Sequence, residues 1–166
     1  VDVLNYVMLE VGQPMHVFDK NKLNGKLKVR FAKTGEKINA LDGNEYLLSS
    51  EIPIIADNQG PQAIAGVIGS NDSSVNKESK SIIIESAFFD QNLIRKSSKK
   101  YRLQTESSYR FERGVDPILN NYALGRVLKI IREFINTDKH FFSNISSKPI
   151  APHIGKAINM DLNQFE

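Results

Sequence analysis

The chain has 166 residues, of which 40% are apolar and 25% charged, and it contains no cysteine and no tryptophan. This composition is that of an ordinary soluble globular protein, and it excludes collagen-like, disordered and disulfide-stapled architectures. The 22 basic and 19 acidic side chains leave a net charge of +3, which fits a polyanionic partner without requiring one.

The chain opens with a predicted helix. Asp2 is placed to cap it, apolar residues recur behind the cap at helical spacing, and Gly12 followed by Pro14 ends it. Apolar runs bounded by turn residues then predict strands, with the dipeptide Asp42-Gly43 at the tip of a hairpin. These runs are 26–31, which alternates and predicts a half-buried strand, 38–41 and 46–48 on either side of the hairpin turn, and the buried runs 52–56 and 63–68.

The second half of the chain alternates between polar and apolar segments. The polar stretch 70–81 predicts a surface loop, and the apolar run 82–89 predicts a further strand. Asp90 is placed to cap a basic helix over 91–103. No apolar run approaches the roughly 18 residues that a membrane span needs, so we expect a cytoplasmic protein with no membrane partner.

The clearest helix is predicted over 116–135. Asp116 occupies the cap position, and Pro117 lies in the first turn, where its missing N–H costs nothing. One apolar stripe follows and needs a sheet or helix to cover it: Leu119, Ala123, Val127, Ile130, Ile131 and Phe134. Helices around a run of strands indicate an α+β fold with an antiparallel or mixed sheet. Because the segment after 136 is rich in Asn, Ser, Lys and Pro, we expect one unit over 1–150, followed by a linker at 151–166 that begins the next unit of a longer protein.

Glu85 is the ionisable residue within the apolar run 82–89. Strand alternation places it on the same face as Ile83 and Ala87, and a buried carboxylate is costly unless it is protonated, paired or hydrogen-bonded. Two interpretations follow. Glu85 is either a strand-end carboxylate paired with an arginine, or a polar group aimed into a ligand pocket.

Other candidates for chemistry are less specific. His16 follows a helix end and a proline, so we expect it on a turn, where binding residues often lie. His140 and His153 have no metal-binding spacing, so no metal site is predicted. Without cysteine or a G-x-S-x-G elbow, a hydrolase would position water rather than form an acyl-enzyme. Gly66 and Gly69 lack the Lys and Ser/Thr of a P-loop and fit a strand bulge or close approach to a ligand.

A basic run crosses the predicted helix 91–103. Such a run is either a solvated helix face or a contact surface for nucleic acid. Its members are Arg95, Lys96, Lys99, Lys100 and Arg102.

Six motifs occur in a fixed order along residues 1–135. They are N-Y-V-M-L-E-V-G-Q-P-M-H-V-F-D (5–19), A-L-D-G (40–43), I-A-D (55–57), A-I-A-G-V-I-G (63–69), I-I-I-E-S-A-F-F-D (82–90) and T-E-S-S-Y-R-F-E-R-G-V-D-P (105–117). In this order the chain resembles the beta subunit of bacterial phenylalanyl-tRNA synthetase, in the central module that holds its editing site.

The resemblance implies a compact, sandwich-like sheet core of unusual topology with flanking helices, and it implies an activity. That activity is hydrolysis of Tyr-tRNA(Phe) made in error, whereas aminoacylation belongs to the alpha subunit. The implied partners are tRNA(Phe) and the alpha subunit, in an assembly of two alpha and two beta subunits. The complete synthetase uses ATP and magnesium, and no cofactor is implied for this segment.

The resemblance also assigns an editing pocket. It implies catalytic roles for His16, Asn5 and Thr105, and substrate binding by Glu85, Gly69 and Ser107. A synthetic pocket shaped for Phe cannot strongly reject an analogue that adds a hydroxyl, so mischarging with Tyr is an expected error. An acceptor that bonds the phenol of Tyr would be left unpaired by Phe, at a cost of about 1–3 kcal/mol. Glu85 is the residue that fits this role.

Two positions depart from the family pattern. Ser107 stands where alanine is usual, and Ser70 replaces a common second glycine after Gly69. Each hydroxyl either narrows the pocket or solvates its rim. The alternative function is a structural or tRNA-docking module without editing activity, in which the basic helix matters more than Glu85.

Overall fold

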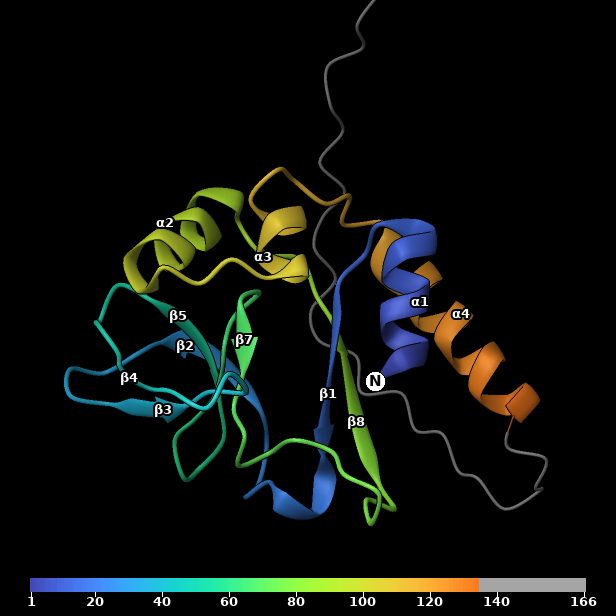
Figure 1. Cartoon of the computed structure of the whole chain (residues 1–166), viewed down its shortest axis with the longest axis horizontal. Coiled ribbons are helices and arrows are strands. Elements are labelled where there is room, and N and C mark those ends of the chain that lie inside the picture. Colours follow the sequence, from blue (N-terminus) through green and yellow to red (C-terminus); the bar gives the residue numbers. More distant parts are fainter. Residues whose placement is uncertain (135–166) are drawn as a thin grey trace, which may run out of the picture.

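The computed structural model of this chain describes residues 1–134 (Figure 1). The predicted boundary near residue 150 and the segment 151–166 lie outside the described residues. In chain order the elements are α1 (Asp2–Val11), β1 (Met15–Asp19), the 3₁₀ helix η1 (Lys20–Lys22), β2 (Lys28–Phe31), β3 (Lys37–Asn39), β4 (Glu45–Leu47), β5 (Pro53–Ala56), β6 (Pro61–Ile64), β7 (Ile68–Gly69), β8 (Ile82–Ser86), α2 (Gln91–Tyr101), α3 (Glu106–Phe111) and α4 (Leu119–Phe134).

Every strand pairing within residues 1–134 is antiparallel. Strands β2, β5, β6 and β7 form a four-stranded sheet in that order, β1 pairs with β8, and β3 with β4 forms a hairpin. The predicted α+β class is confirmed, and its sheets are antiparallel rather than mixed. The β1–β8 pair joins segments that are far apart in the sequence, and this pairing positions the site described below.

Helices α1 and α4 lie side by side next to the β1–β8 pair (Figure 1). Apolar side chains at helical spacing face inward from both helices, and together they bury Leu4, Val7, Ala123 and Val127 against Val17 of β1. This layer holds α1 and β1 as one wall of the molecule.

Helices α2 and α3 cover the four-stranded sheet. Ile94 of α2 and Phe111 of α3 belong to one buried cluster with Ile54 and Ile64 of the sheet. Gly66 follows β6 at a φ of +66°, and a Cβ placed there would lie 2.8 Å from the Cδ1 of Ile94. Glycine is therefore required at this turn by both its backbone conformation and its packing.

Several predicted elements are confirmed. The hairpin at Asp42-Gly43 is β3–β4, the run 52–56 contains β5, and the basic helix is α2. The carboxylate of Asp90 caps α2 by accepting the backbone N–H groups of Asn92 and Leu93. The turn signal at Asp42-Gly43 and the cap signal at Asp90 were thus sufficient to locate these two elements.

Three predictions for the first half of the chain are wrong. The cap of α1 is Val1, which makes no side-chain bond, and Asp2 lies within the first turn. His16 lies on strand β1 and not on a turn, because its backbone pairs with β8. Strand β2 is an edge strand with only β5 beside it, and it exposes the apolar residues that the alternation was expected to bury, with Val29 64% and Phe31 52% exposed.

In the second half, two predicted strands are shorter than expected. The run 63–68 divides into β6 and β7 at Gly66, and the run 82–89 is a strand only as far as Ser86. The six-residue helix α3 was not predicted at all. A helix this short offers too few residues for a periodic pattern, and its capping box alone marks its start.

The last helix differs from its prediction at both ends of the apolar stripe. Asp116 lies in a turn, where its carboxylate accepts the backbone N–H of Ile118, and α4 begins at Leu119. Phe134 is exposed, whereas Ala123, Val127 and Ile130 are buried. The stripe therefore covers the core through its middle part.

Candidate functional site

A cavity of about 420 Å³ lies where α1, β1, β8, α3 and the β6–β7 segment meet. All six pocket residues assigned from the resemblance contribute to its lining, although they come from five separate segments of the chain. They are Asn5, His16, Gly69, Glu85, Thr105 and Ser107. The structure thus brings together every residue of the predicted pocket, while the role of each residue stays a prediction.

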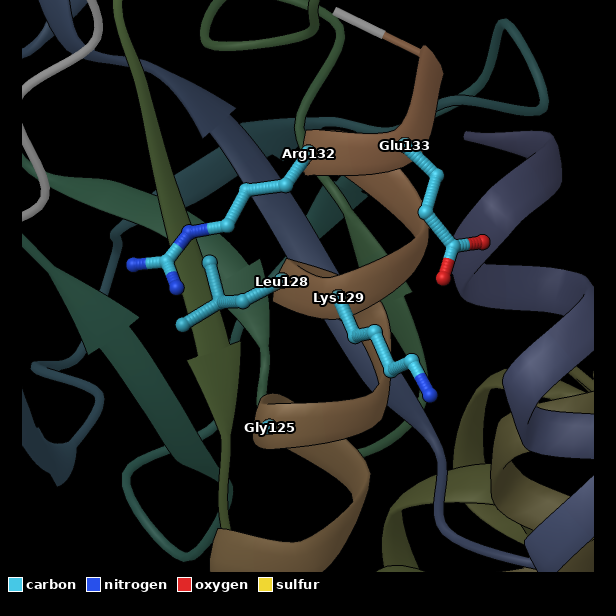
Figure 2. A pocket seen from close by; sticks show the side chains of 5 residues that line it. All are labelled: Gly125, Leu128, Lys129, Arg132 and Glu133. Atoms are coloured by element: carbon cyan, nitrogen blue, oxygen red, sulfur yellow. The ribbon is translucent and has the colours of Figure 1, made fainter.

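A second hollow, of about 380 Å³, lies on the surface of α4 (Figure 2). Its five lining residues all belong to that one helix: Gly125, Leu128, Lys129, Arg132 and Glu133. A groove along one helix face has no walls to enclose a ligand, so the first cavity is the better candidate for a binding site.

His16 and Glu85 form a directly opposed pair in the β1–β8 ladder. Opposed residues of an antiparallel pair project to the same side of the sheet, so both side chains reach the cavity from its β1–β8 wall. The pairing also explains why sequence reasoning alone did not connect them, since nearly seventy positions separate them in the printed chain.

Glu85 has no hydrogen-bond or ion-pair partner among residues 1–134. Its side chain keeps some exposure toward the cavity, but protein atoms crowd the carboxyl group, and this burial raises its pKa to about 7. The interpretation of Glu85 as a carboxylate paired with an arginine is therefore wrong. The other interpretation, a polar group aimed into a pocket, agrees with its position.

His16 is packed tightly on the opposite strand. Burial lowers its pKa to about 4, so the imidazole is neutral near pH 7, and its Nε2 has no partner in the described part of the chain. The ring makes an edge contact with Phe18 at a centroid distance of 4.6 Å. A Cβ on Gly69 would lie 2.4 Å from the Cε1 of His16, so the missing side chain of Gly69 is what leaves room for the imidazole.

Asn5 and Ser107 add polar groups to the lining from two helices. Asn5 is exposed on α1, and Ser107 is half-buried in the first turn of α3. Neither side chain makes a hydrogen bond with another of residues 1–134, so both polar groups are available to a ligand. The hydroxyl of Ser107 therefore adds a polar group to the cavity wall.

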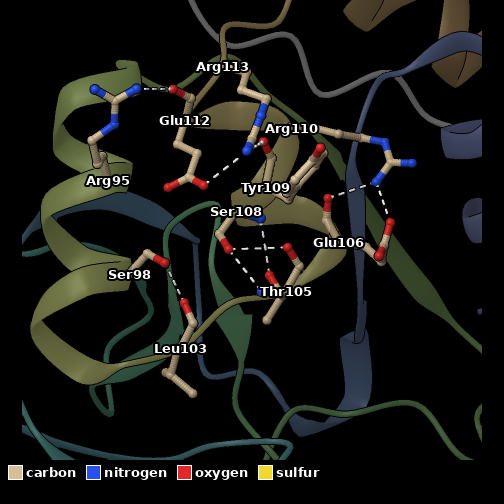
Figure 3. A network of polar contacts seen from close by, with 10 residues as sticks. All are labelled: Arg95, Ser98, Leu103, Thr105, Glu106, Ser108, Tyr109, Arg110, Glu112 and Arg113. Carbon is tan, nitrogen blue, oxygen red and sulfur yellow. Dashed lines mark hydrogen bonds and ion pairs between the residues drawn. The ribbon is translucent and has the colours of Figure 1, made fainter.

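Thr105 is engaged in the architecture of α3 (Figure 3). Its hydroxyl donates to the carbonyl of Val67 at 2.8 Å and accepts the N–H of Ser108 at 3.1 Å, while its own N–H donates to the hydroxyl of Ser108. This capping box begins α3 and ties it to the segment between β6 and β7. The single hydroxyl proton of Thr105 is thus committed to Val67.

Ser70 does not line the cavity. Its buried hydroxyl donates to the carbonyl of Asn39 and accepts the N–H of Asp72, next to the isolated bridge between Ser70 and Ala40. This departure from the family pattern fastens the β3 segment to the β7 segment and leaves the pocket unchanged.

Sequence reasoning missed further lining residues, of which four flank the predicted ones within or beside the same motifs. They are Leu41 in the hairpin turn, Val67 before β7, and Glu106 and Phe111 on α3. Each lies inside or beside a motif that was quoted for the resemblance, but as isolated apolar or charged residues they carried no signal of their own.

The basic run lies on α2, outside the cavity lining. Glu51 accepts hydrogen bonds from Lys96 at 2.6 Å and Lys100 at 2.9 Å, and these bonds hold the pKa of Glu51 down to about 2. Arg95 donates to the carbonyl of Glu112, and Arg102 ends the helix in a left-handed conformation. Two of the five cations thus already have a carboxylate partner.

Two general properties concern residues 1–134 only. No three His, Asp or Glu side chains there gather closely enough to hold a metal ion. None of the helices there has the length and apolar content needed to cross a membrane.

Comparison with known proteins gives a consistent result. Residues 1–136 match the family model described as the B3/4 domain. The chain is also similar to curated proteins named phenylalanine–tRNA ligase beta subunit. It is 47% identical to that of Legionella pneumophila (strain Lens) over 131 residues, which cover 79% of this chain and 16% of the relative. It is 54% identical to that of Aquifex aeolicus (strain VF5) over 116 residues, which cover 70% of this chain and 15% of the relative. It is 41% identical to that of Coxiella burnetii (strain RSA 493 / Nine Mile phase I) over 158 residues, which cover 95% of this chain and 20% of the relative. The chain therefore spans only 15 to 20% of the length of these relatives.

Proposed function

This chain belongs to the B3/4 domain family, and from that premise we propose that it is the segment of a phenylalanine–tRNA ligase beta subunit in which mischarged Tyr-tRNA(Phe) is hydrolysed. In this proposal tRNA(Phe) is the substrate, and the alpha subunit is the partner that carries out aminoacylation. The names of the relatives support the assignment to the ligase, and the cavity supports the assignment to editing.

One observation carries the editing proposal: an unpaired carboxyl group projects into a cavity that is otherwise largely apolar. Glu85 lacks any partner among residues 1–134, and its burial raises its pKa to about 7. A phenol O–H that entered the cavity would supply the missing hydrogen bond, and a phenyl ring would not. Leaving such a group unpaired costs about 1–3 kcal/mol, more for a charged group.

The remaining polar residues support orientation of the ester. A base with a pKa of about 4 gains little by accepting a proton near pH 7, so His16 acts as a neutral hydrogen-bonding group toward the ester or its attacking water. Asn5 offers a free amide from α1. Thr105 acts by positioning α3, since its hydroxyl proton is donated to Val67.

The alternative, a docking module without editing, depends on the basic helix. Its support is smaller because Lys96 and Lys100 are both bound to Glu51. It also gives no reason for the unpaired carboxyl group of Glu85 in the cavity.

The test is deacylation of Tyr-tRNA(Phe) and Phe-tRNA(Phe) by the complete synthetase that contains this segment. Glu85→Ala is expected to slow hydrolysis of the Tyr ester by roughly 10- to 200-fold, the equivalent of one buried hydrogen bond, and to leave slow hydrolysis of the Phe ester unchanged. For the Tyr ester, the rate with Glu85→Gln should fall between the rates with the wild type and Glu85→Ala, since an amide oxygen still accepts the phenol proton. Glu78→Ala in the exposed 70–81 loop is the matched control.

Equal loss on both esters would make Glu85 a general base instead of a discriminator. No loss on either ester would assign the segment to the docking alternative.

A further inference from the structure

Helix α3 connects the cavity to an exposed aromatic and basic surface. Thr105, Glu106 and Ser107 at its start line the cavity, together with Phe111 at its end. Arg110 lies one helical turn after Glu106, so these two residues share the face of α3 that borders the cavity. Its guanidinium donates to the carboxylate and to the backbone carbonyl of Glu106 (Figure 3).

Beside Arg110, the guanidinium of an arginine lies over the ring of a tyrosine. The guanidinium carbon of Arg113 is 3.5 Å from the centroid of the Tyr109 ring, and Arg113 also donates to the backbone carbonyl of Tyr109 at 2.8 Å. Tyr109 is 45% exposed, and the side chain of Arg113 is 52% exposed. The pair is therefore a preformed stack with open surface on both members.

A third guanidinium belongs to the same surface. Arg95 reaches from α2 to the carbonyl of Glu112 at 3.0 Å, as Figure 3 shows, and it has no carboxylate partner among residues 1–134. Among residues 1–134, the three arginines Arg95, Arg110 and Arg113 have two carboxylate partners, Glu106 for Arg110 and Glu112 for Arg113. The surface thus retains one net positive charge, as the Glu51 side of α2 does with two lysines and one carboxylate. What this surface adds is the exposed ring of Tyr109 beside the charge.

We propose that the Tyr109–Arg113 stack and Arg110 bind the single-stranded end of the RNA whose aminoacyl ester occupies the cavity. This inference rests on the proposed function, because it takes the bound molecule to be an aminoacyl-tRNA. An unpaired base stacks on the Tyr109–Arg113 pair, and Arg110 exchanges Glu106 for a backbone phosphate. Single-stranded RNA ends are recognised in this way, by aromatic rings and guanidinium planes for the bases and by cations for the phosphates.

The position of α3 supports this assignment. The ester is attached to the ribose of the terminal nucleotide, so the base of that nucleotide must lie at the rim of the cavity that holds the ester. Glu106 is at that rim, Tyr109 and Arg110 follow it in α3, and Arg113 lies two residues after the end of the helix. Helix α3 contributes lining residues to the cavity, whereas α2, which carries the lysines of the basic run, contributes none.

The first experiment measures hydrolysis of Tyr-tRNA(Phe) by the complete synthetase. Tyr109→Ala is expected to raise KM by roughly 5- to 100-fold, the effect of losing one base stack, with kcat within about twofold. Tyr109→Phe keeps the ring and should behave like the wild type. The control is Tyr122→Ala, which removes another exposed tyrosine (62% exposed) from α4 and should change nothing. Arg110→Gln should reduce the slope of log affinity against log salt by about one.

A second readout does not depend on hydrolysis. A tRNA(Phe) that carries tyrosine through an amide bond, with a fluorescent adenine analogue as its terminal base, is bound to the same variants. Wild type and Tyr109→Phe should quench the fluorophore by stacking, and Tyr109→Ala should not. Unchanged quenching and unchanged KM in Tyr109→Ala would overturn the proposal.

The two proposals fail separately. If Glu85→Ala leaves Tyr-tRNA hydrolysis unaffected, editing by this cavity is refuted, and the quenching by Tyr109 still decides whether the surface binds the RNA end. If Glu85→Ala acts as expected and Tyr109→Ala does not, the editing proposal stands, and the RNA end contacts a surface other than the Tyr109–Arg113 stack.

Discussion

His16 and Glu85 lie opposite each other across the β1–β8 pair, and burial shifts their pKa values in opposite directions, to about 4 and about 7. Both shifts favour the neutral form, since desolvation disfavours charge on an acid and on a base alike. Between these two pKa values the site therefore holds two uncharged polar groups.

Glu85 is expected to make stability fall as pH rises. Its pKa is about 7 in the folded chain against 4.5 for an ordinary glutamate, so the folded state binds the proton more tightly. The stability that this provides is full below pH 4.5 and is lost as pH rises through 7, by about 3 kcal/mol at most. Denaturant unfolding of wild type and Glu85→Gln across this window measures the effect, because glutamine does not titrate. If the free energy of unfolding depends on pH in the same way in both proteins, Glu85 is not the source of the pH dependence.

Gly69→Ala is expected to act through His16. The new Cβ would lie 2.4 Å from the imidazole, whereas the backbone of Gly69 has no left-handed conformation that alanine would strain. The imidazole must therefore move, and Tyr-tRNA hydrolysis by the complete enzyme should fall at least 10-fold, as catalytic geometry is lost with displacements of about 1 Å.

The control for that prediction is a double-mutant cycle. His16→Ala removes the ring that Gly69→Ala displaces, so the two losses should not add in the double variant. Additive losses would show that Gly69 affects the site by some route other than His16.

Thr105 is expected to matter for position and stability more than for chemistry. Thr105→Ala removes the cap of α3 and its bond to Val67, and it should lower the free energy of unfolding by about 1–2 kcal/mol. Thr105→Ser keeps both hydrogen bonds and should retain stability and hydrolysis. A large loss of kcat in the serine variant, with stability intact, would restore a direct catalytic role.

Substitution of Gly66, which lines the cavity, tests how tightly α2 and α3 pack on the sheet, and substitution of Gly125 on α4 is the comparison. Gly66→Ala places a Cβ 2.8 Å from Ile94 at a φ of +66°, so it should destabilise the chain by about 1–3 kcal/mol. Gly125→Ala on α4 meets no atom within 4 Å and should stabilise by up to about 1 kcal/mol through helix propensity. Thermal unfolding compares the two, and a neutral Gly66→Ala would mean that α2 and α3 shift easily on the sheet.

Local signals in the sequence predicted two of the local elements, the β3–β4 hairpin and the start of α2, although the caps predicted at Asp2 and Asp116 are wrong. The Asp42-Gly43 turn and the Asp90 cap each involve residues within a few positions of one another, and both are found in the structure. Strand β1 was missed because its five residues carry no alternation of their own and form a strand only through β8. Burial on β2 was wrong for the same reason, since Val29 and Phe31 have no element packed over them within residues 1–134.

The site shows a similar division. Glu85 was found from its residue type alone, because an ionisable group in an apolar strand needs an explanation. His16 and Gly69 carried only unspecific signals of their own, and it was the resemblance that assigned them to one pocket with Asn5, Thr105 and Ser107. The cavity contains all five. The sequence pattern did not predict which group each of these side chains contacts. The hydrogen bond from Thr105 to Val67 is an example, because a bond between segments distant in the sequence produces no characteristic residue spacing.

The five segments that surround the cavity also determine when it can exist. The earliest lining residue is Val1 and the latest is Phe111, and the β1–β8 pair between them is formed only after a long connecting stretch has been made. Contacts between distant segments close late in folding, because the entropy of the intervening chain must be lost first. A nascent chain released before α3 could form the β3–β4 hairpin but would have no enclosed cavity. Ligand occupancy of the cavity is thus a measure of completed folding, and no shorter N-terminal piece ending before α3 can be expected to bind.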